Sequence, residues 1–332
     1  MPEAKFFSID ELGEMPPPRW LIHEMFEANS LVMVAGPPGS FKSFLVLDWL
    51  LCMASGRNWQ GKHTEKSRIL YVLGEGRSSL LKRIQVWIHH NKLSAEEKRT
   101  LNENFKVTFD VPQMATRSSV DNMLIGLQSL NFNPQVLAID TFARSFVGMD
   151  ENTQKDVGLW VDSADRLRSL GYTVIFLHHT SKNTEFGVRY RGSTAILGAM
   201  DTAMTLVRDP DITDGVKLTI TKQKDHDEGE PLYFSRLIIN PPGMPDGSMV
   251  LIRAMKMDER YSEEGQAMEK AVAELMSNEN FLSDRARSRE LAKQFNLSES
   301  AAQGRISRKR KMMDAAVVMR ASHETVSLPH PE

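Results

Sequence analysis

The feature that most constrains this chain is a glycine-rich run at the end of a short apolar stretch. Residues 31–35 are all apolar, and they are followed directly by the run Gly36-Pro37-Pro38-Gly39-Ser40-Phe41-Lys42-Ser43. An amphipathic segment over residues 42–54 comes next, so the pattern predicts a buried strand, a tight loop and a helix. Backbone N–H groups in such a loop surround an anion at the positive end of the helix. We therefore expect the eight residues of the run to bind phosphate.

Two residues of this loop carry distinct chemistry. We expect Lys42 to reach the β- and γ-phosphates of ATP, and the Ser43 hydroxyl to complete the shell of a bound Mg²⁺. The usual pattern has a second glycine directly before the lysine, whereas this chain has Phe41. The sequence therefore leaves the backbone path of the loop open. The alternative is an ordinary glycine-rich turn between a strand and a helix.

Apolar and amphipathic segments alternate after the loop. The predicted strands cover residues 68–75, 105–111, 136–141 and 172–180, and the predicted helices cover residues 78–90, 118–130 and 156–170. Apolar strands that alternate with helices indicate an α/β fold with a mostly parallel sheet covered on both faces. Beyond residue 200, three segments alternate apolar and polar residues and are joined by turn-forming residues, which predicts an antiparallel extension of the sheet.

The pattern divides the chain into four parts. Residues 1–30 contain three consecutive prolines and are predicted to form an extended arm, followed by the α/β core over residues 31–256. Residues 257–320 read as helices separated by a short turn, which predicts a small all-α or winged-helix domain of helix-turn-helix type. Residues 321–332 are predicted to be a flexible tail.

Composition excludes several classes of protein. The net charge is −2, so any contact with nucleic acid must come from local basic patches. The single cysteine, Cys52, excludes an intrachain disulfide and lies in an apolar run, which predicts a buried thiol. The start of the chain lacks the pattern of a signal peptide, and no apolar stretch approaches the roughly twenty residues that span a bilayer. We expect a cytoplasmic protein without a membrane partner.

Acidic and histidine side chains come at the ends of the predicted strands. Asp140 and Glu75 each end a strand at the same sheet edge as the phosphate loop. There Asp140 can hold the water shell of Mg²⁺, and Glu75 can take a proton from an attacking water. The alternative for Glu75 is an acid that caps the following helix. Of His178 and His179, we expect one to face the nucleotide and the other to face the helix layer.

Five motifs together carry a resemblance to a known family. GPPGSFKS, LYVLGEGR, VLAIDT, FLHHTSK and YRGSTAILGAMDT occur in this order within residues 15–240. The chain is similar to RecA-fold ATPases of the plasmid RepA replicative-helicase type, also described as AAA_25 domains in phage and mobile-element proteins. The resemblance implies a RecA-like core and a homo-oligomer, such as a hexameric ring or a filament, with ATP between subunits. It also implies Lys42 and Ser43 on phosphate and Mg²⁺, Glu75 as catalytic base, Asp140 on Mg²⁺ and His179 as the sensor of the γ-phosphate.

In such assemblies a neighbouring subunit supplies a cation to the γ-phosphate. Lys222 and Lys224 resemble the Lys-x-Arg pair of related hexameric helicases, although the second member here is lysine. Lysine is a point charge without the bidentate fork of arginine, and Arg208 is a competing candidate. The alternative is an edge strand whose lysines face water.

Two regions are candidates for binding DNA. In the core, loops over residues 143–158 and 181–193 are expected to contact single strands, with cations and a stackable ring at Lys182, Arg189, Tyr190 and Arg191. In the predicted C-terminal domain a basic cluster can meet double-stranded DNA, through Arg305, Arg308, Lys309 and Arg310. The alternatives are a solvated basic loop, a structural role for Arg191 at the subunit interface, and a helix-turn-helix that docks a protein.

The function that these features predict is an ATP-hydrolysing DNA motor, a ring-forming replicative helicase acting on single-stranded DNA. One alternative is an ATP-dependent recombination or annealing protein that works as a filament. A second is a DNA-binding regulator or loader that uses ATP as an assembly switch.

Overall fold

The computed structural model describes most of the chain. It covers residues 6–180, 194–210, 212, 214–244, 246–254, 263–277, 283–295, 299, 302–303 and 306–307. Two compact units follow each other along the sequence, residues 1–255 and residues 256–332. Each unit is described by itself.

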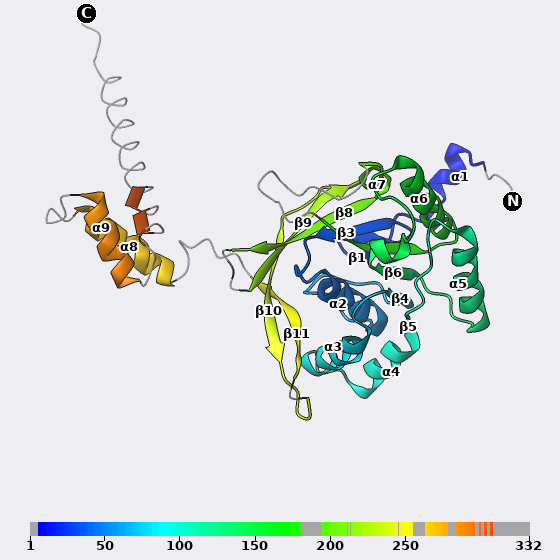
Figure 1. The fold of residues 1–332 in the computed structure, drawn as a ribbon, viewed down its shortest axis with the longest axis horizontal. Helices are drawn as coiled ribbons and strands as arrows, with labels where there is room; N and C mark the ends of the chain where they lie inside the picture. Colours follow the sequence, from blue (N-terminus) through cyan, green and yellow to red (C-terminus); the bar gives the residue numbers. More distant parts are fainter. Residues whose placement is uncertain are drawn as a thin grey trace, which may run out of the picture. The chain divides into compact units, whose positions relative to one another are not determined.

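A nine-stranded sheet forms the centre of the first unit (Figure 1), in the order β11-β10-β9-β8-β3-β7-β6-β4-β5. The parallel part consists of β3 (Leu31–Gly36), β4 (Ile69–Leu73), β5 (Phe105–Thr108), β6 (Val136–Asp140), β7 (Thr173–His179) and β8 (Thr202–Asp209). The antiparallel part adds β9 (Gly215–Gln223), β10 (Leu232–Ile239) and β11 (Ser248–Ala254). Because the phosphate loop follows β3, it leaves the middle of the sheet.

Helices cover both faces of this sheet. One layer consists of α2 (Lys42–Ser55), α3 (Arg77–His90) and α4 (Ala95–Asn104), and the other of α5 (Arg117–Ser129), α6 (Gln154–Ser169) and α7 (Thr194–Ala199) (Figure 1). The strands are apolar on both sides, as a doubly covered sheet requires. Val32 and Val34 join the core on the α2 side, whereas Leu31, Met33 and Ala35 join the core on the α6 side. The predicted α/β fold class, a mostly parallel sheet flanked by helices with an antiparallel extension, is confirmed.

The N-terminal segment differs from the extended arm expected over residues 1–30. It contains the short helix α1 (Ile9–Gly13) and the strands β1 (Trp20–Ile22) and β2 (Phe26–Glu27), which pair antiparallel. Leu21, Ile22 and Phe26 of this hairpin are fully buried, and the Phe26 ring lies 5.4 Å from the Trp49 ring of α2. Burial of this apolar surface against α2 makes the hairpin part of the core.

Helix α4 was not anticipated from the sequence, and the residues at its start explain why it forms. The Ser94 hydroxyl accepts from the Glu97 N–H, and the Glu97 carboxylate accepts from the Ser94 N–H at 2.7 Å. This reciprocal pair is a capping box, which satisfies backbone donors at the helix start. None of the described helices of the chain is both long enough and apolar enough to cross a membrane.

The second unit is helical in its described residues. It contains α8 (Glu263–Ser277) and α9 (Asp284–Gln294), whose apolar side chains form one cluster. Leu291, Ala292, Phe295 and Ile306 belong to this cluster. The basic residues Arg305, Arg308, Lys309 and Arg310, and the tail over 321–332, lie outside the described residues.

Candidate active site

The loop after β3 shows why its glycines are needed. A Cβ on Gly36 would overlap the carbonyl oxygen of Leu206 in the neighbouring strand β8. Gly39 adopts a left-handed backbone with φ 77°, which glycine adopts at little cost. Phe41 is also left-handed, with φ 68°. Phe41 therefore adopts the left-handed turn at the position where the usual pattern has glycine.

Lys42 begins α2 and turns back towards its own loop. Its Nζ donates to the carbonyl oxygens of Gly36 at 2.8 Å and Pro37 at 3.0 Å. The side chain is almost fully buried, and this burial lowers the pKa of Lys42 to about 8, with Asp140 acting in the opposite direction. An anion beside the ammonium group favours its charged form. The site is therefore preorganised for a negatively charged ligand.

Asp140 ends β6, and its carboxylate accepts hydrogen bonds from two hydroxyl groups. The Tyr71 hydroxyl donates to Oδ2 at 2.8 Å, and Ser43 also donates to this carboxylate. Burial raises the pKa of Asp140, and these two hydrogen bonds oppose that effect. Ser43 and Asp140, the pair expected to hold Mg²⁺, thus lie together. Their oxygen atoms are of the type that Mg²⁺ prefers.

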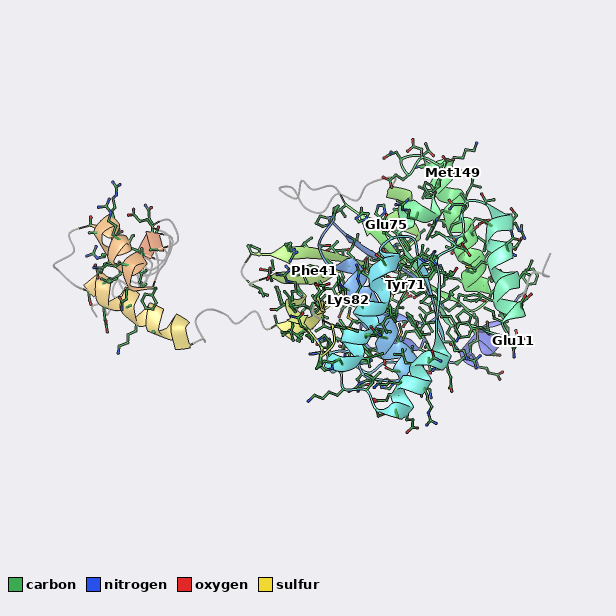
Figure 2. The ribbon with its side chains drawn as sticks, turned by 60° about the horizontal axis from the view of Figure 1, so that its bottom comes forward. Glu11, Phe41, Tyr71, Glu75, Lys82 and Met149 are labelled. Carbon is green, nitrogen blue, oxygen red and sulfur yellow. The ribbon has the colours of Figure 1, made fainter. Side chains whose placement is uncertain are left out.

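Glu75 follows β4 at the same edge of the sheet (Figure 2). Its Oε1 lies 3.0 Å from Nε of Arg144, in the short 3-10 helix η1 (Phe142–Ser145) after β6. Glu75 is also close enough to Asp140 for its charge to raise the pKa of that carboxyl. The two acidic groups are therefore neighbours, and Arg144 partly neutralises the charge of Glu75.

The two histidines of β7 lie in different environments. His179 Nδ1 is 3.4 Å from Nζ of Lys42, so this ring reaches the phosphate loop. His178 is buried, and its ring meets the Phe142 ring edge-on with centroids 5.2 Å apart. Alternation along the strand places one ring at the loop and the other in the helix layer.

Several buried hydroxyl groups at this edge fit a polar ligand. Among the described residues, Ser40, Thr141 and Thr180 each have a buried hydroxyl oxygen without a hydrogen-bond partner. They lie in the loop after β3 and directly after β6 and β7. Buried hydroxyl groups are usually hydrogen-bonded, because an unmet bond is costly. A hydrated phosphate and its metal ion would supply the missing partners.

The three candidates for a cation in trans are all engaged by residues of their own chain. Arg208 lies over the Phe41 ring, 3.8 Å from its centroid. Lys222 donates to the carbonyl oxygens of Leu197 and Gly198, both at 2.9 Å. Lys224 forms a 3.6 Å ion pair with Asp201, and its side chain is 63% exposed.

These candidates lie at opposite edges of the sheet. Arg208 pairs with Val216 near the phosphate loop, whereas Lys222 pairs with Ala203 at the start of β8. Since β8 runs parallel to β3, the start of β8 lies at the edge away from the loop. Lys222 and Lys224 therefore lie away from the phosphate loop of their own chain.

Sequence reasoning missed three contributors to the site: Tyr71, Arg144 and the contact between Arg208 and Phe41. Tyr71 has a visible signal, because it is a hydroxyl-bearing residue in a strand that is otherwise aliphatic. The other two depend on contacts between distant segments. Of the DNA-binding candidates in the core, Lys182, Arg189, Tyr190 and Arg191 lie outside the described residues.

Comparison with known proteins gives the family. No curated protein matches the chain. Among solved structures, one ATPase domain has 15% identity and a TM-score of 0.47, covering 67% of this chain and 84% of that one. The RadB recombinase has 17% identity and a TM-score of 0.45, covering 63% of this chain and 87% of that one. A KaiC-like protein from Pyrococcus horikoshii has 14% identity and a TM-score of 0.45, covering 70% of this chain and 93% of that one.

The model of the family AAA_25, described as an AAA domain, matches residues 2–185. This match spans more than half of the chain and contains the phosphate loop, Glu75, Asp140 and His179. The chain therefore belongs to the AAA_25 family of AAA-domain P-loop ATPases.

Proposed function

We propose that this chain is the subunit of a ring-forming replicative helicase of the plasmid RepA type, encoded by a phage, plasmid or other mobile element. It uses ATP and Mg²⁺ to move along single-stranded DNA. The observation that supports this most is the convergence of Lys42, Asp140, Glu75 and His179 at one sheet edge, beside a loop shaped for phosphate.

Each side chain of the cluster has a defined task. The ammonium group of Lys42 donates hydrogen bonds to two carbonyl oxygens of the loop. When ATP binds, it donates to phosphate oxygens instead. Ser43 and Asp140 hold Mg²⁺, which neutralises charge on the phosphates when it is bound. Glu75 orients the attacking water and accepts its proton.

His179 links the nucleotide to the rest of the molecule. Its ring contacts Lys42 through Nδ1, and it ends the strand that precedes the proposed DNA-binding loop over residues 181–193. A change in the position of Lys42 would therefore be transmitted to β7. Such a link is what an ATP-driven motor requires between hydrolysis and strand movement.

Lys224 is the residue we assign to the γ-phosphate of the neighbouring subunit. It lies at the sheet edge away from its own loop, and its side chain is 63% exposed. Lys222 is held by the end of α7, and Arg208 is held by Phe41 beside its own loop. An exposed cation far from its own site is the one that a second subunit can use.

The experiment that tests the helicase is strand separation on forked DNA with ATP and Mg²⁺. We expect the wild type to unwind the fork, and Lys42→Ala and Glu75→Gln to lose unwinding. Arg19→Ala serves as the control, because Arg19 forms an exposed ion pair with Glu65 in a part of the chain outside the cluster. Hydrolysis stimulated by DNA without strand separation would contradict the helicase and favour a filament-forming recombination or annealing protein.

A further inference from the structure

We infer that Arg144 is a positioning residue for which Glu75 and a nucleic-acid phosphate compete, so that strand binding releases Glu75 for catalysis. This inference rests on the proposed function, because it assigns a regulator to the same site. It concerns how DNA binding accelerates hydrolysis in one subunit.

The contact between the two side chains is built into the backbone. Arg144 Nε lies 3.0 Å from Glu75 Oε1. A Cβ on Gly74 would lie 2.8 Å from both Cβ and Cγ of Arg144, so a side chain at position 74 would displace the arginine stem. The Gly74 N–H also donates to the Asp140 carbonyl oxygen at 2.6 Å. The end of β4 and the start of η1 are therefore fitted to each other at this point.

The backbone of Arg144 is fixed from the other side as well. The side-chain amide of Gln113 donates to the Arg144 carbonyl oxygen at 3.0 Å, and its Oε1 accepts from the Val147 N–H at 2.9 Å. The neighbouring Ser145 is fully buried, and its hydroxyl accepts from Trp160 Nε1 at 3.0 Å. Only the guanidinium end of Arg144 is left to move.

That guanidinium is exposed to water, and it is one of few positive charges in its loop. The Arg144 side chain is 57% exposed. The only other cation in the loop over residues 143–158 is Lys155, and Asp150 and Glu151 lie between the two. A phosphate that approaches this loop therefore meets one guanidinium. Arginine binds phosphate through two parallel N–H groups, which is a stronger arrangement than an exposed single contact with a carboxylate.

Release of Glu75 changes the active site directly. While Oε1 accepts from Arg144 Nε, that oxygen is held by η1. When the guanidinium turns to a phosphate, Glu75 becomes a carboxylate free to accept the proton of the attacking water. The rate of ATP hydrolysis then depends on whether a DNA strand is bound at the loop that contains Arg144.

The test measures steady-state ATP hydrolysis by the full chain with Mg²⁺, with and without single-stranded poly(dT). We expect Arg144→Ala to raise the DNA-free kcat about three- to fivefold, the factor that corresponds to one exposed ion pair. The KM for ATP should stay unchanged, and stimulation by poly(dT) should largely disappear. Arg144→Lys, which can keep the ion pair, should retain low DNA-free activity.

Arg19→Ala is the matched control, because the Arg19 side chain is also 57% exposed and also pairs with a glutamate. Arg144→Gln is the second variant, since it keeps a long stem against Gly74 if the alanine variant fails to fold. The inference is overturned if the Arg144 variants behave like Arg19→Ala, or if their DNA-free rate falls. Loss of hydrolysis in Glu75→Gln with unaltered Arg144 variants would leave the proposed function standing without this regulator. A wild type that hydrolyses no ATP would overturn both.

Discussion

Phe41 shows how one residue can depart from a motif and keep its geometry. A left-handed backbone at a residue with a Cβ costs about 1 kcal/mol. The Phe41 ring offsets this through the Arg208 guanidinium 3.8 Å from its centroid and through an edge-on contact with Phe44, with centroids 6.3 Å apart. A cation above an aromatic ring contributes about 0.5–1 kcal/mol at an exposed site. The contacts of the Phe41 ring thus offset the free-energy cost of its left-handed backbone.

Substitution of Phe41 separates these two effects. Phe41→Gly loses the ring and relieves the backbone, whereas Phe41→Ala loses the ring and keeps the unfavourable φ of 68°. We expect the alanine variant to be less stable than the glycine variant by about 1 kcal/mol in urea unfolding. An alanine variant equal to or more stable than the glycine variant would show that the loop does not keep its left-handed turn.

The residues of the site differ in how visible they are in the sequence. Lys42 could be predicted from the glycine-rich loop, and Asp140, Glu75 and His179 because each lies at or just beyond the end of an apolar strand, and parallel strands end at one edge. Arg144 could not, because its importance comes from the distance between its guanidinium and Glu75, 69 positions away. The position of a residue in one strand can be read from the neighbouring sequence, whereas a contact between two distant loops cannot.

At the scale of elements, the β1–β2 hairpin and α4 are two of the parts that sequence patterns failed to predict, together with α1, α7 and β11. The hairpin strands have three and two residues, too few for a periodic signal, and Pro16-Pro17-Pro18 dominates the segment. In α4 the buried residue is Leu101, so the helix lacks an apolar stripe. Its capping box was the available signal. Both elements are held by contacts that only the assembled core supplies.

Burial of the hairpin can be tested by comparing two phenylalanines. Phe26 is fully buried against α2, whereas Phe6 is 88% exposed. We expect Phe26→Ala to lower the free energy of unfolding by about 3–5 kcal/mol, because it leaves a cavity in the core. Phe6→Ala should change it by less than about 0.5 kcal/mol. Similar small effects in both variants, measured by denaturant unfolding, would mean that residues 20–27 form an arm after all.

Helix α2 carries the single cysteine on its buried side. Cys52 is 4% exposed, and burial together with the nearby Asp48 raises the pKa of its thiol far above the usual range. The thiolate is the reactive form, so we expect no labelling of the native protein by an aromatic disulfide reagent at about pH 8. One thiol should react once the chain is unfolded in guanidinium chloride. Rapid labelling of the native protein would place Cys52 at the surface.

At the scale of the whole molecule, the proposed active site is incomplete in one subunit. The phosphate loop lies at one edge of the sheet, and Lys222 and Lys224 lie at the other. The proposed assembly joins the two edges across a subunit interface. A cation from the neighbour would then stabilise the charge that develops on the γ-phosphate.

Mixing of two inactive subunits tests this arrangement. Lys42→Ala lacks a working loop, and Lys224→Ala lacks the proposed cation. In a mixture, some interfaces combine the intact loop of one variant with the intact Lys224 of the other. We expect the mixture to hydrolyse ATP faster than either variant alone at the same total concentration. A rate equal to the mean of the two variants would exclude Lys224 as the residue that acts in trans.

In the proposed mechanism, ATP is bound by the loop around Lys42 and hydrolysed with Glu75 as the base. Its most direct test compares ATP binding and single-turnover hydrolysis in the same preparations of the full chain with Mg²⁺. We predict that Lys42→Ala loses binding, whereas Glu75→Gln binds ATP like the wild type and hydrolyses it about 10²- to 10⁴-fold more slowly. Hydrolysis at the wild-type rate by Glu75→Gln, or undiminished ATP binding by Lys42→Ala, would contradict this mechanism.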